Sequence, residues 1–489
     1  MTDSRGAHAP NLKNAAHQAM LDNGFAPDFP QDAVREAQTM TDGAPPVGAD
    51  IRDLRALLWT SIDNADTKDL DQLEIAERLP GGETRILIAV ADVDWRVPKN
   101  SACDRHAAEN TTSVYTGVIT FAMLPERLST DLTSLREDVD REAVVISFVV
   151  AADGTTKDHE VYRALVHNRG KLAYDSAGAW LEGSAAAPPK IAASADVAAQ
   201  VRMQDAAAQL MRQHRHEAGA LELETIEASP VMRDGKVVSL ALTRKSRARD
   251  LIEDFMIAAN GAMARFLERR GSASIRRIVR TPERWNRIVA LAKTLGDTLS
   301  ETPSSAALSE FLARRRTTDP DHFPDLSLSV VKLLGPGEYA LDTPGAASDG
   351  HFGLAVMDYT HSTAPNRRFA DLVTQRLVKA SLAGAAAPYT NDELAAIALR
   401  CTQKENDARK VERTMRKKAA AALLEGREGE MFDAIVTGAS EKGTYVRVLA
   451  PPVEGRVMRG ATGLDVGDKT RVRLTSVDER KGFIDFERA

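Results

Sequence analysis

The chain has 489 residues, of which 43% are hydrophobic and 27% charged, so it is long enough for about two to four globular domains. Its formal net charge of −6 excludes a polycation and leaves only local basic patches for any contact with nucleic acid. Cys103 and Cys401 are the only cysteines, which excludes a zinc cluster and favours a reducing compartment. Because the N-terminus lacks a signal-peptide pattern and no apolar run approaches about 20 residues, we expect a cytoplasmic protein with no membrane partner.

The first part of the chain is predicted to form helices and then strands. Residues 11–40 predict two short helices separated by a segment with two prolines. Apolar and alternating runs predict strands at 57–63, at both ends of 70–93 around a glycine turn, and at 139–150. The Ala/Pro-rich stretch 184–199 is expected to be a surface connection.

The pattern becomes helical from about residue 195. The clearest amphipathic helix is predicted over 248–270, and further helices over 371–382 and 394–425. From Gly429 to the end, glycine turns separate five expected strands within about 60 residues, the size of an OB-type barrel. We therefore expect an α+β protein in three parts: a helical segment (1–48), a large body (49–428) and a small all-β OB-fold barrel (429–489).

Four aspartates lie at the end of the strand expected at 57–63 and just after it, namely Asp63, Asp66, Asp69 and Asp71. Asp69 and Asp71 are two positions apart, so their side chains face the same way in an extended chain. Asp63 stands at the end of the preceding strand, and we expect these three carboxylates to converge. Hard cations such as Mg²⁺ take oxygen ligands, and two ions about 3.5–4 Å apart can clamp both reacting oxygens of a phosphodiester.

Two simpler interpretations compete with a metal site. Four aspartates in a short stretch are more often a solvated loop. A calcium loop of the EF-hand type, counted from Asp63, would place Glu74 at position 12. Ala65 at position 3 and Lys68 at the glycine position exclude that loop.

The segment around the aspartates, RDLRALLWTSIDNADTKDLDQ, resembles the opening signature of the RNB catalytic domain of ribonuclease II enzymes. The resemblance implies a mixed sheet surrounded by helices over 49–428, and it favours the metal site over the solvated loop. It implies that Asp63, Asp69 and Asp71 are metal-site residues and that Asp71 is the most critical catalytic aspartate. Gln72 stands at the fourth aspartate of the family, where an amide can ligate through its oxygen but carries no charge.

A second signature, HFGLAVMDYTHSTAPNRRFADLVTQRL, begins at residue 351. Thr363 is expected to cap a helix, which would place Arg367 and Arg368 near its N-terminus, where backbone N–H groups favour anions. On the pattern alone, an ordinary pair of surface arginines is the commoner explanation. The segment resembles the family's HFGL…Y…TSPIRRY motif, which implies that Arg367 holds the scissile phosphate. We expect Arg368 to contact RNA as well.

Two tyrosines lie in further blocks that resemble the family. Tyr115, in AENTTSVYTGVITFAMLPERLSTDLTSLRED, matches a base-stacking tyrosine, and Tyr174, in RGKLAYDSAGAWLE, matches the tyrosine beside the terminal nucleotide. Stacking on an aromatic ring contributes about 1–3 kcal/mol per base, whereas an isolated tyrosine is more often a half-buried core residue. Leu223 falls where the family has a second stacking aromatic, so the base clamp is expected to be one-sided.

The helix expected over 248–270 contains ARDLIEDFMIAAN, which resembles the family's LIEEFMLLAN. Glu253 and Asn260 are seven positions apart and share a helix face. The resemblance implies that Glu253 contacts the last nucleotide, and we expect Asn260 to bind RNA beside it. An ordinary exposed glutamate is an equally common explanation for Glu253.

The segment from Gly429 to the end resembles an S1-type RNA-binding barrel. Such barrels bind single strands with aromatic residues and a basic groove. We expect Phe432 and Tyr445 to contact RNA, with nearby charges from Arg447, Arg456 and Arg459. The basic run at 404–418 is either a solvated helix face or a phosphate contact.

The resemblance implies a Mg²⁺-dependent 3′-to-5′ exoribonuclease, with Mn²⁺ as the alternative ion, that releases nucleoside 5′-monophosphates. Single-stranded RNA is the expected partner. Residues 11–38 resemble the helical preamble of the catalytic domain, so we expect no cold-shock barrels and a tolerance for short 3′ overhangs. Two alternatives stay open: an RNB-fold protein that binds RNA 3′ ends with little or no cleavage, and a DNA-directed phosphodiesterase.

Overall fold

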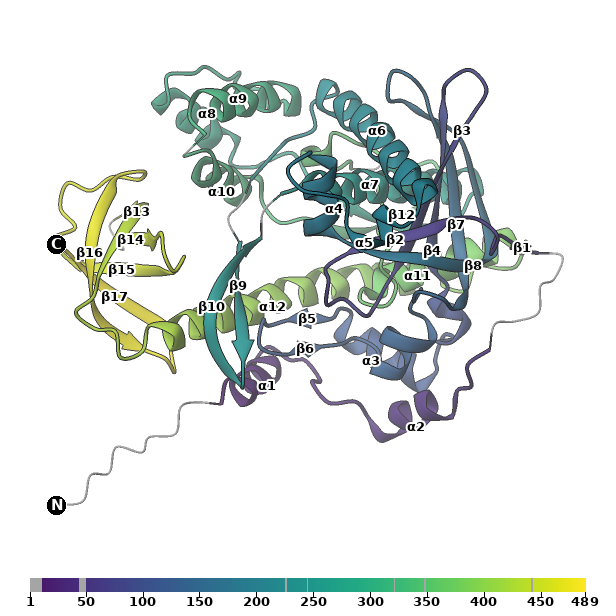
Figure 1. Ribbon diagram of the computed structural model, residues 1–489, viewed down its shortest axis with the longest axis horizontal. Coiled ribbons are helices and arrows are strands. Elements are labelled where there is room, and N and C mark those ends of the chain that lie inside the picture. The colour runs from purple at the N-terminus through teal and green to yellow at the C-terminus, as the bar shows by residue number, and fades with distance from the viewer. Residues whose placement is uncertain are drawn as a thin grey trace.

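The computed structural model describes residues 11–43, 50–224, 227–243, 245–320, 322–346, 349–440 and 443–489. The chain forms a large body of helices and strands and a small barrel. Helix α12 (Asn391–Leu424) runs along the body and leads into the barrel (Figure 1). Residues 1–10 of the predicted N-terminal segment, and its boundary at residues 48 and 49, lie outside the described residues. The predicted α+β class, with a mixed sheet and a C-terminal barrel, is confirmed.

The centre of the body is a mixed sheet with the strand order β1-β8-β2-β3-β4-β7. Strand β8 pairs in parallel with β1 and β2 and antiparallel with β7, so the pairings β8-β2-β3-β4-β7-β8 form a closed ring. The sequence analysis predicted β2, β3, β4 and β7 but not β1 or β8. The strands are β1 (Ile51–Asp53), β2 (Trp59–Asp63), β3 (Gln72–Arg78), β4 (Thr84–Ala91), β7 (Asp140–Val150) and β8 (Thr156–Ala173).

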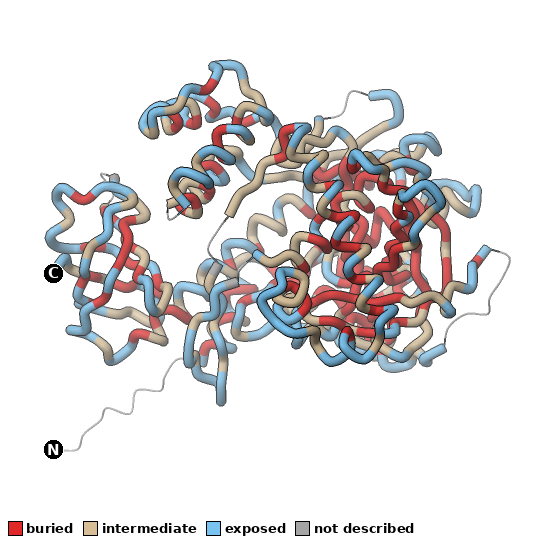
Figure 2. Tube along the Cα trace, turned by 45° about the horizontal axis from the view of Figure 1, so that its top comes forward, coloured by how far each residue is buried: buried red, intermediate tan, exposed pale blue. Residues whose placement is uncertain are grey.

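Helices cover this sheet and enclose a continuous apolar core (Figure 2). Helix α7 (Arg247–Arg269) is the most buried long helix near the sheet, and Ser246 caps its first turn. The predicted surface connection at 184–199 is wrong in part, because it contains α5 (Pro189–Ala192) and the start of α6, which Ser194 caps. The core also includes residues of the first part of α12 and of α2 (Gln31–Thr39), α3 (Ala102–Asn110), α4 (Tyr174–Leu181), α6 (Ala195–Glu217) and α11 (Phe369–Leu382).

Smaller units surround the body. Helices α8 (Trp285–Thr294), α9 (Ser305–Thr318) and α10 (Phe323–Leu334) share their own apolar cluster and form the α8–α10 unit. Helix α1 (Leu12–Asp22) packs against α12. The short strand pairs are β5 (Val114–Tyr115) with β6 (Thr120–Phe121), β9 (Glu227–Arg233) with β10 (Lys236–Thr243), and β11 (Ser274–Ile278) with β12 (Glu338–Asp342).

The C-terminal segment forms a closed barrel with the strand order β13-β14-β15-β17-β16 and a separate apolar core. Its strands are β13 (Met431–Ser440), β14 (Gly443–Val448), β15 (Glu454–Arg459), β16 (Lys469–Asp478) and β17 (Phe483–Arg488). Among the described residues, no helix combines the length and the hydrophobicity that a membrane crossing requires.

Candidate active site

The residues of both signatures meet at one cavity of about 300 Å³. The end of β2, the start of β3 and the start of α4 here face helix α7 and the loop before α11. The lining residues are Asp63, Asn64, Thr67, Asp69, Asp71, Gln72, Tyr115, Tyr174, Arg249, Ile252, Met256, Thr363 and Arg367. The fold thus brings the acidic segment, one arginine of the pair and both predicted tyrosines to one place.

The acidic side chains lie on a loop that joins two buried strands. Asp63 ends β2, all of whose residues are buried, and Gln72 begins β3. Between them the Thr67 N–H donates to the Asn64 carbonyl (3.1 Å), which turns the chain back. The Lys171 ammonium on β8 donates to the Thr67 carbonyl (2.5 Å) and holds this turn against the sheet.

Burial makes these carboxyl groups weak acids. Asp63 and Asp71 are only 8% and 2% exposed. Loss of hydration raises the pKa of Asp63 to about 6 and the pKa of Asp71 to about 7, although the Arg367 guanidinium opposes both shifts. Loss of hydration also raises the pKa of Asp69. A cation placed among these groups would therefore stabilise their ionised forms.

A further carboxyl group stands behind Asp63. Glu74 on β3 is fully buried, and within the described part of the chain neither of its side-chain oxygens has a hydrogen-bond partner. Burial, reinforced by the charge of Asp63, raises the pKa of Glu74 well above its ordinary value. The sequence analysis considered Glu74 only as a calcium-loop position. Its signal was a charged residue inside an apolar strand.

Arg367 connects the two signatures. Its Nε lies 3.2 Å from Asp71 Oδ2, and the neighbouring Asn366 N–H donates to Asp71 Oδ1 (3.2 Å). The Arg367 side chain is 47% exposed and lines the cavity, so part of its guanidinium remains accessible there. Because a guanidinium can bind a phosphate with two parallel hydrogen bonds, Asp71 orients an arginine that is suited to that task.

The loop before α11 differs from the sequence prediction. Helix α11 begins at Phe369, so Thr363 does not cap it. Instead the buried Asp371 carboxylate accepts the Ala364 N–H (2.8 Å) and binds Arg368 Nη2 (2.7 Å). Arg368 thus forms an internal ion pair that shapes the loop, and its contact with RNA stays a prediction.

The two residues predicted on helix α7 have different surroundings. Asn260 is 2% exposed, and its Oδ1 accepts both the N–H and the hydroxyl of Ser362 (2.9 Å each). The predicted RNA contact of Asn260 is therefore corrected to a buried contact that holds the arginine segment. The Glu253 side chain is 51% exposed and its carboxylate lies 4.0 Å from Arg212 Nη2, outside the set of cavity-lining residues. The contact of Glu253 with the last nucleotide stays a prediction.

Arg249 is a cavity residue that the sequence analysis missed. Its guanidinium lies over the Tyr174 ring, 4.5 Å from the centroid, and donates to Asn64 Oδ1 (3.0 Å). Arg249, Ile252 and Met256 line the cavity at the i, i+3, i+7 spacing of one helix face, which was a readable signal. Leu223 packs instead against the α8–α10 unit. Helix α7 thus contributes a guanidinium and two apolar side chains to the lining of the cavity.

In the barrel, exposure separates the two predicted aromatic contacts. Tyr445 on β14 is 43% exposed and pairs in register with Arg456 on β15. Phe432 is 6% exposed and belongs to the barrel core, so its predicted RNA contact is corrected. Arg447 is also unavailable, because it forms a two-bond ion pair with Asp325 of α10 (3.0 and 3.3 Å).

The donor set fits a hard divalent cation in kind. Carboxylate and amide oxygens from Asp63, Asp69, Asp71 and Gln72 line one cavity, and Asp63 Oδ2 is buried without a hydrogen-bond partner among the described residues. Those residues nevertheless contain no cluster of three His, Cys, Asp or Glu side chains assembled around one point. The convergence of Asp63, Asp69 and Asp71 on one ion stays a prediction, and Arg367 and the Asn366 N–H contact the Asp71 oxygens. Water and a substrate phosphate are suited to complete the ligand set.

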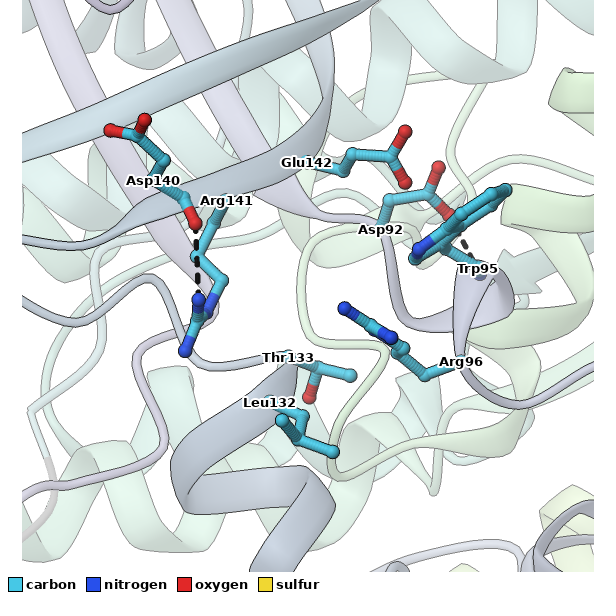
Figure 3. Close-up of a pocket in the computed structure, with 8 residues that line it drawn as sticks. All are labelled: Asp92, Trp95, Arg96, Leu132, Thr133, Asp140, Arg141 and Glu142. Atoms are coloured by element: carbon cyan, nitrogen blue, oxygen red, sulfur yellow. Dashed lines mark hydrogen bonds between the residues drawn. The ribbon is translucent and has the colours of Figure 1, made fainter. Parts of the chain in front are cut away.

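A second enclosed space lies near the end of β4, between Asp92 and Glu142 (Figure 3). Its volume is about 10 Å³, which is room for a single water molecule. Burial and the nearby charge of Asp92 raise the pKa of Glu142 to about 7, and Lys379 donates to Asp92 Oδ1 (2.7 Å). This space is too small for a nucleotide. The cavity lined by Asp63, Asp71 and Arg367 is the candidate active site because it brings the residues of both signatures together.

Comparison with known families supports this assignment. Residues 51–384 match the RNB domain, and residues 430–489 match the RNase II-type exonuclease C-terminal S1 domain. Ribonuclease R 1 of Lactococcus lactis is 26% identical over 94% of this chain and 59% of its own length. The chain therefore spans about three fifths of that relative.

Solved structures show the same fold. The structure titled Mycoplasma genitalium RNase R in complex with ribose methylated single-stranded RNA has a TM-score of 0.88 at 21% identity, covering 98% of this chain and 78% of that one. Yeast Ssd1, described as a pseudonuclease, has a TM-score of 0.69 at 16% identity, covering 92% of this chain and 56% of that one.

Proposed function

Because this chain belongs to the RNB family, we propose that it is a 3′-to-5′ exoribonuclease that hydrolyses single-stranded RNA to nucleoside 5′-monophosphates. We propose Mg²⁺ as the cofactor, with Mn²⁺ as the alternative, and the cytoplasm as the location. One observation carries the proposal: the cavity that contains Asp63, Asp69 and Asp71 also contains Arg367 and Tyr174. Metal ligands, a phosphate ligand and a stacking ring thus share one space.

Each group has a distinct task in this proposal. A divalent cation held by Asp63, Asp69 and Asp71 supplies Lewis-acid chemistry at the phosphate when bound. Arg367 binds the phosphate of the last linkage and neutralises the charge that develops there. As its guanidinium turns toward the phosphate, it releases the Asp71 oxygen that it contacts now. Tyr174 stacks against the terminal base.

The test is digestion of 5′-labelled single-stranded RNA by the purified chain with Mg²⁺, beside a chelator control. We expect the labelled RNA to shorten successively from its 3′ end. Mass spectrometry should identify nucleoside 5′-monophosphates as the products. Internal cuts, 3′-phosphate products or undiminished cleavage in the chelator would contradict the proposal.

A second function is favoured by one feature of the site. By the family resemblance, the neutral amide of Gln72 stands at the fourth aspartate, and among the described residues no three His, Cys, Asp or Glu side chains form a metal cluster. These features suit an RNB-fold protein that holds RNA 3′ ends and cleaves slowly or not at all, as the pseudonuclease label of one fold neighbour illustrates. Tight RNA binding without turnover at any Mg²⁺ or Mn²⁺ concentration would establish this alternative.

A further inference from the structure

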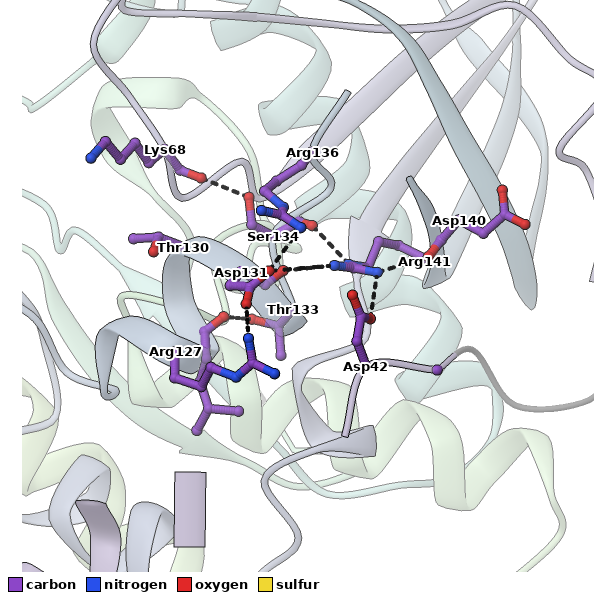
Figure 4. A network of polar contacts seen from close by, with 12 residues as sticks. Asp42, Lys68, Arg127, Thr130, Asp131, Thr133, Ser134, Arg136, Asp140 and Arg141 are labelled. Atoms are coloured by element: carbon purple, nitrogen blue, oxygen red, sulfur yellow. Dashed lines mark hydrogen bonds and ion pairs between the residues drawn. The ribbon is translucent and has the colours of Figure 1, made fainter. Parts of the chain in front are cut away.

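A short segment behind the cavity touches both loops that build it. Residues 133–135 follow the helical turn η2 (Leu128–Leu132) and lie between the acidic loop and the arginine segment. Thr133 and Ser134 are 4% and 0% exposed. Figure 4 shows Ser134 reaching Lys68 of the acidic loop while Arg141 approaches the same segment from the sheet.

Ser134 fixes the chain on both sides of Asp69. Its hydroxyl donates to the Lys68 carbonyl (2.7 Å) and accepts the Leu70 N–H (3.0 Å). The Leu135 N–H donates to the Leu70 carbonyl (2.9 Å). Because one hydroxyl binds the residues before and after Asp69, it restrains the backbone from which that carboxylate projects.

Thr133 reaches the other half of the site. Its Oγ1 lies 2.5 Å from the side-chain amide oxygen of Asn366. Asn366 precedes Arg367, and its N–H donates to Asp71 Oδ1 (3.2 Å). Two adjacent hydroxyl residues therefore contact the loop of Asp69 and the loop of Arg367.

The segment is itself held from behind. Arg141 on β7, 6% exposed, donates to the carbonyls of Ser134 (3.2 Å) and Asp131 (3.1 Å) and to Asp42 Oδ1 (3.1 Å). The Asp131 carboxylate also pairs with Arg136 (2.8 Å) and with an arginine one turn earlier in the chain (Figure 4). The two hydroxyl groups are thus mounted on a fixed support rather than on a free loop.

The site has a physical need for such a support. Asp63, Asp69 and Asp71 line one cavity, and Asp69 lies on the loop that joins β2 to β3. Reacting groups must be held to within about 0.5 Å for efficient chemistry.

We propose that Ser134 and Thr133 are positioning residues of the reaction, which fix the Asp69 loop and the Arg367 loop to one piece of chain. This inference rests on the proposed function. Ser134 sets the geometry in which Asp69 meets the cation, and Thr133 sets the distance between the acidic loop and Arg367. Neither side chain is among the residues that line the cavity.

The test uses near-isosteric changes with matched controls from the preceding helical turn, η2. Ser134→Ala and Thr133→Val remove the two hydroxyl groups, and Thr133→Ser restores one. Ser129→Ala and Thr130→Val are the controls, because the hydroxyls of Ser129 and Thr130 reach only carbonyls of residues 124–126.

Ser134→Ala is expected to raise the dissociation constant of Mn²⁺, measured by electron paramagnetic resonance, and the half-saturating Mg²⁺ concentration by roughly 10- to 100-fold. RNA affinity in chelator should change less than about twofold, because stacking and phosphate contacts remain. Hydrogen exchange of residues 66–71 should accelerate in the metal-free protein. Thr133→Val should lower kcat and accelerate exchange at 364–367, whereas Thr133→Ser keeps both near wild type.

Hydrogen exchange and Mn²⁺ binding do not require turnover. The positioning role of Ser134 and Thr133 and the proposed nuclease function can therefore fail separately. Wild-type exchange rates and Mn²⁺ affinity in a folded Ser134→Ala protein, with no effect of Thr133→Val beyond that of Thr130→Val, would overturn the positioning role. If Ser134→Ala does not fold, the Thr133→Val and Thr133→Ser pair decides the question alone. If hydrogen exchange changes in the variants but the wild-type protein has no nuclease activity, the positioning contacts are supported and the proposed exonuclease function is refuted.

Discussion

Replacing Asp71 by Asn should stabilise the metal-free fold while it abolishes hydrolysis. Asp71 is 2% exposed, and burial raises its pKa from the usual 3.8 to about 7 even though Arg367 stands beside it. The folded protein therefore keeps a proton on Asp71 at pH values where the unfolded chain has already released it. Stability from this group is complete below pH 3.8 and is lost as the pH rises through about 7.

The size of this effect follows from the two pKa values. Each tenfold change in proton affinity corresponds to about 1.4 kcal/mol, so the difference between 3.8 and about 7 amounts to about 4 kcal/mol at pH 8. The amide introduced by Asp71→Asn would be uncharged in both the folded and the unfolded state, and its oxygen can still accept the Asn366 N–H. We expect Asp71→Asn to raise the free energy of unfolding by up to about 4 kcal/mol at pH 8 and by only about 1 kcal/mol at pH 4.5.

The measurement is urea unfolding in chelator at both pH values for wild type, Asp71→Asn and the exposed control Asp66→Asn. Mg²⁺ should stabilise the wild type but not Asp71→Asn, and RNA binding should survive the change while hydrolysis is lost. Equal or lower stability of Asp71→Asn at pH 8 would refute the reasoning, because the buried charge would then carry no cost.

Substitutions at four further positions test the rest of the site and the barrel. Gln72→Asp should lower the Mg²⁺ concentration required for half-maximal activity, and unchanged or weaker Mg²⁺ dependence would show that this chain builds its metal site differently. Arg249→Ala should raise KM for short oligonucleotides by the equivalent of about 1–3 kcal/mol with little change in kcat. Arg249→Lys should recover only part of this affinity, because lysine lacks the planar guanidinium. Equal KM values for wild type and Arg249→Ala would show that Arg249 is not part of the base pocket. Tyr445→Ala should weaken RNA binding without lowering the melting temperature, whereas Phe432→Ala should destabilise the barrel by about 3–5 kcal/mol, and the reverse pattern would contradict their assigned positions.

The sheet and the barrel were predictable where side-chain patterns are local. β2, β4 and β7 are apolar runs, and the barrel strands alternate between glycine turns. β8 was missed because its first half is polar and mostly exposed, and only the second half carries the burial of a central strand. Its long register with β7 is a tertiary property that no window of sequence contains.

The site residues show the same difference between what a local sequence pattern reveals and what depends on tertiary contacts. Asp63 and Asp71 were found because a motif concentrates them, and the pairing of β2 with β3 keeps them close. Arg368 and Arg447 have the right chemistry for phosphate, yet Asp371 and Asp325 occupy them. Whether an arginine is free depends on which acid the fold places beside it, and Asp325 lies 122 positions from Arg447 along the chain.

The helix that was expected to start at Thr363 illustrates the same limit in the backbone. Thr363 is a good capping residue, but Asp371 accepts the Ala364 N–H from within the following helix. The segment before Phe369 is therefore a loop and not the first turns of a helix. This loop places Arg367 beside Asp71. A continuous helix would have carried Arg367 on its surface, where a guanidinium and a buried aspartate could not meet. The departure from local capping preference thus creates the contact on which the proposed chemistry depends.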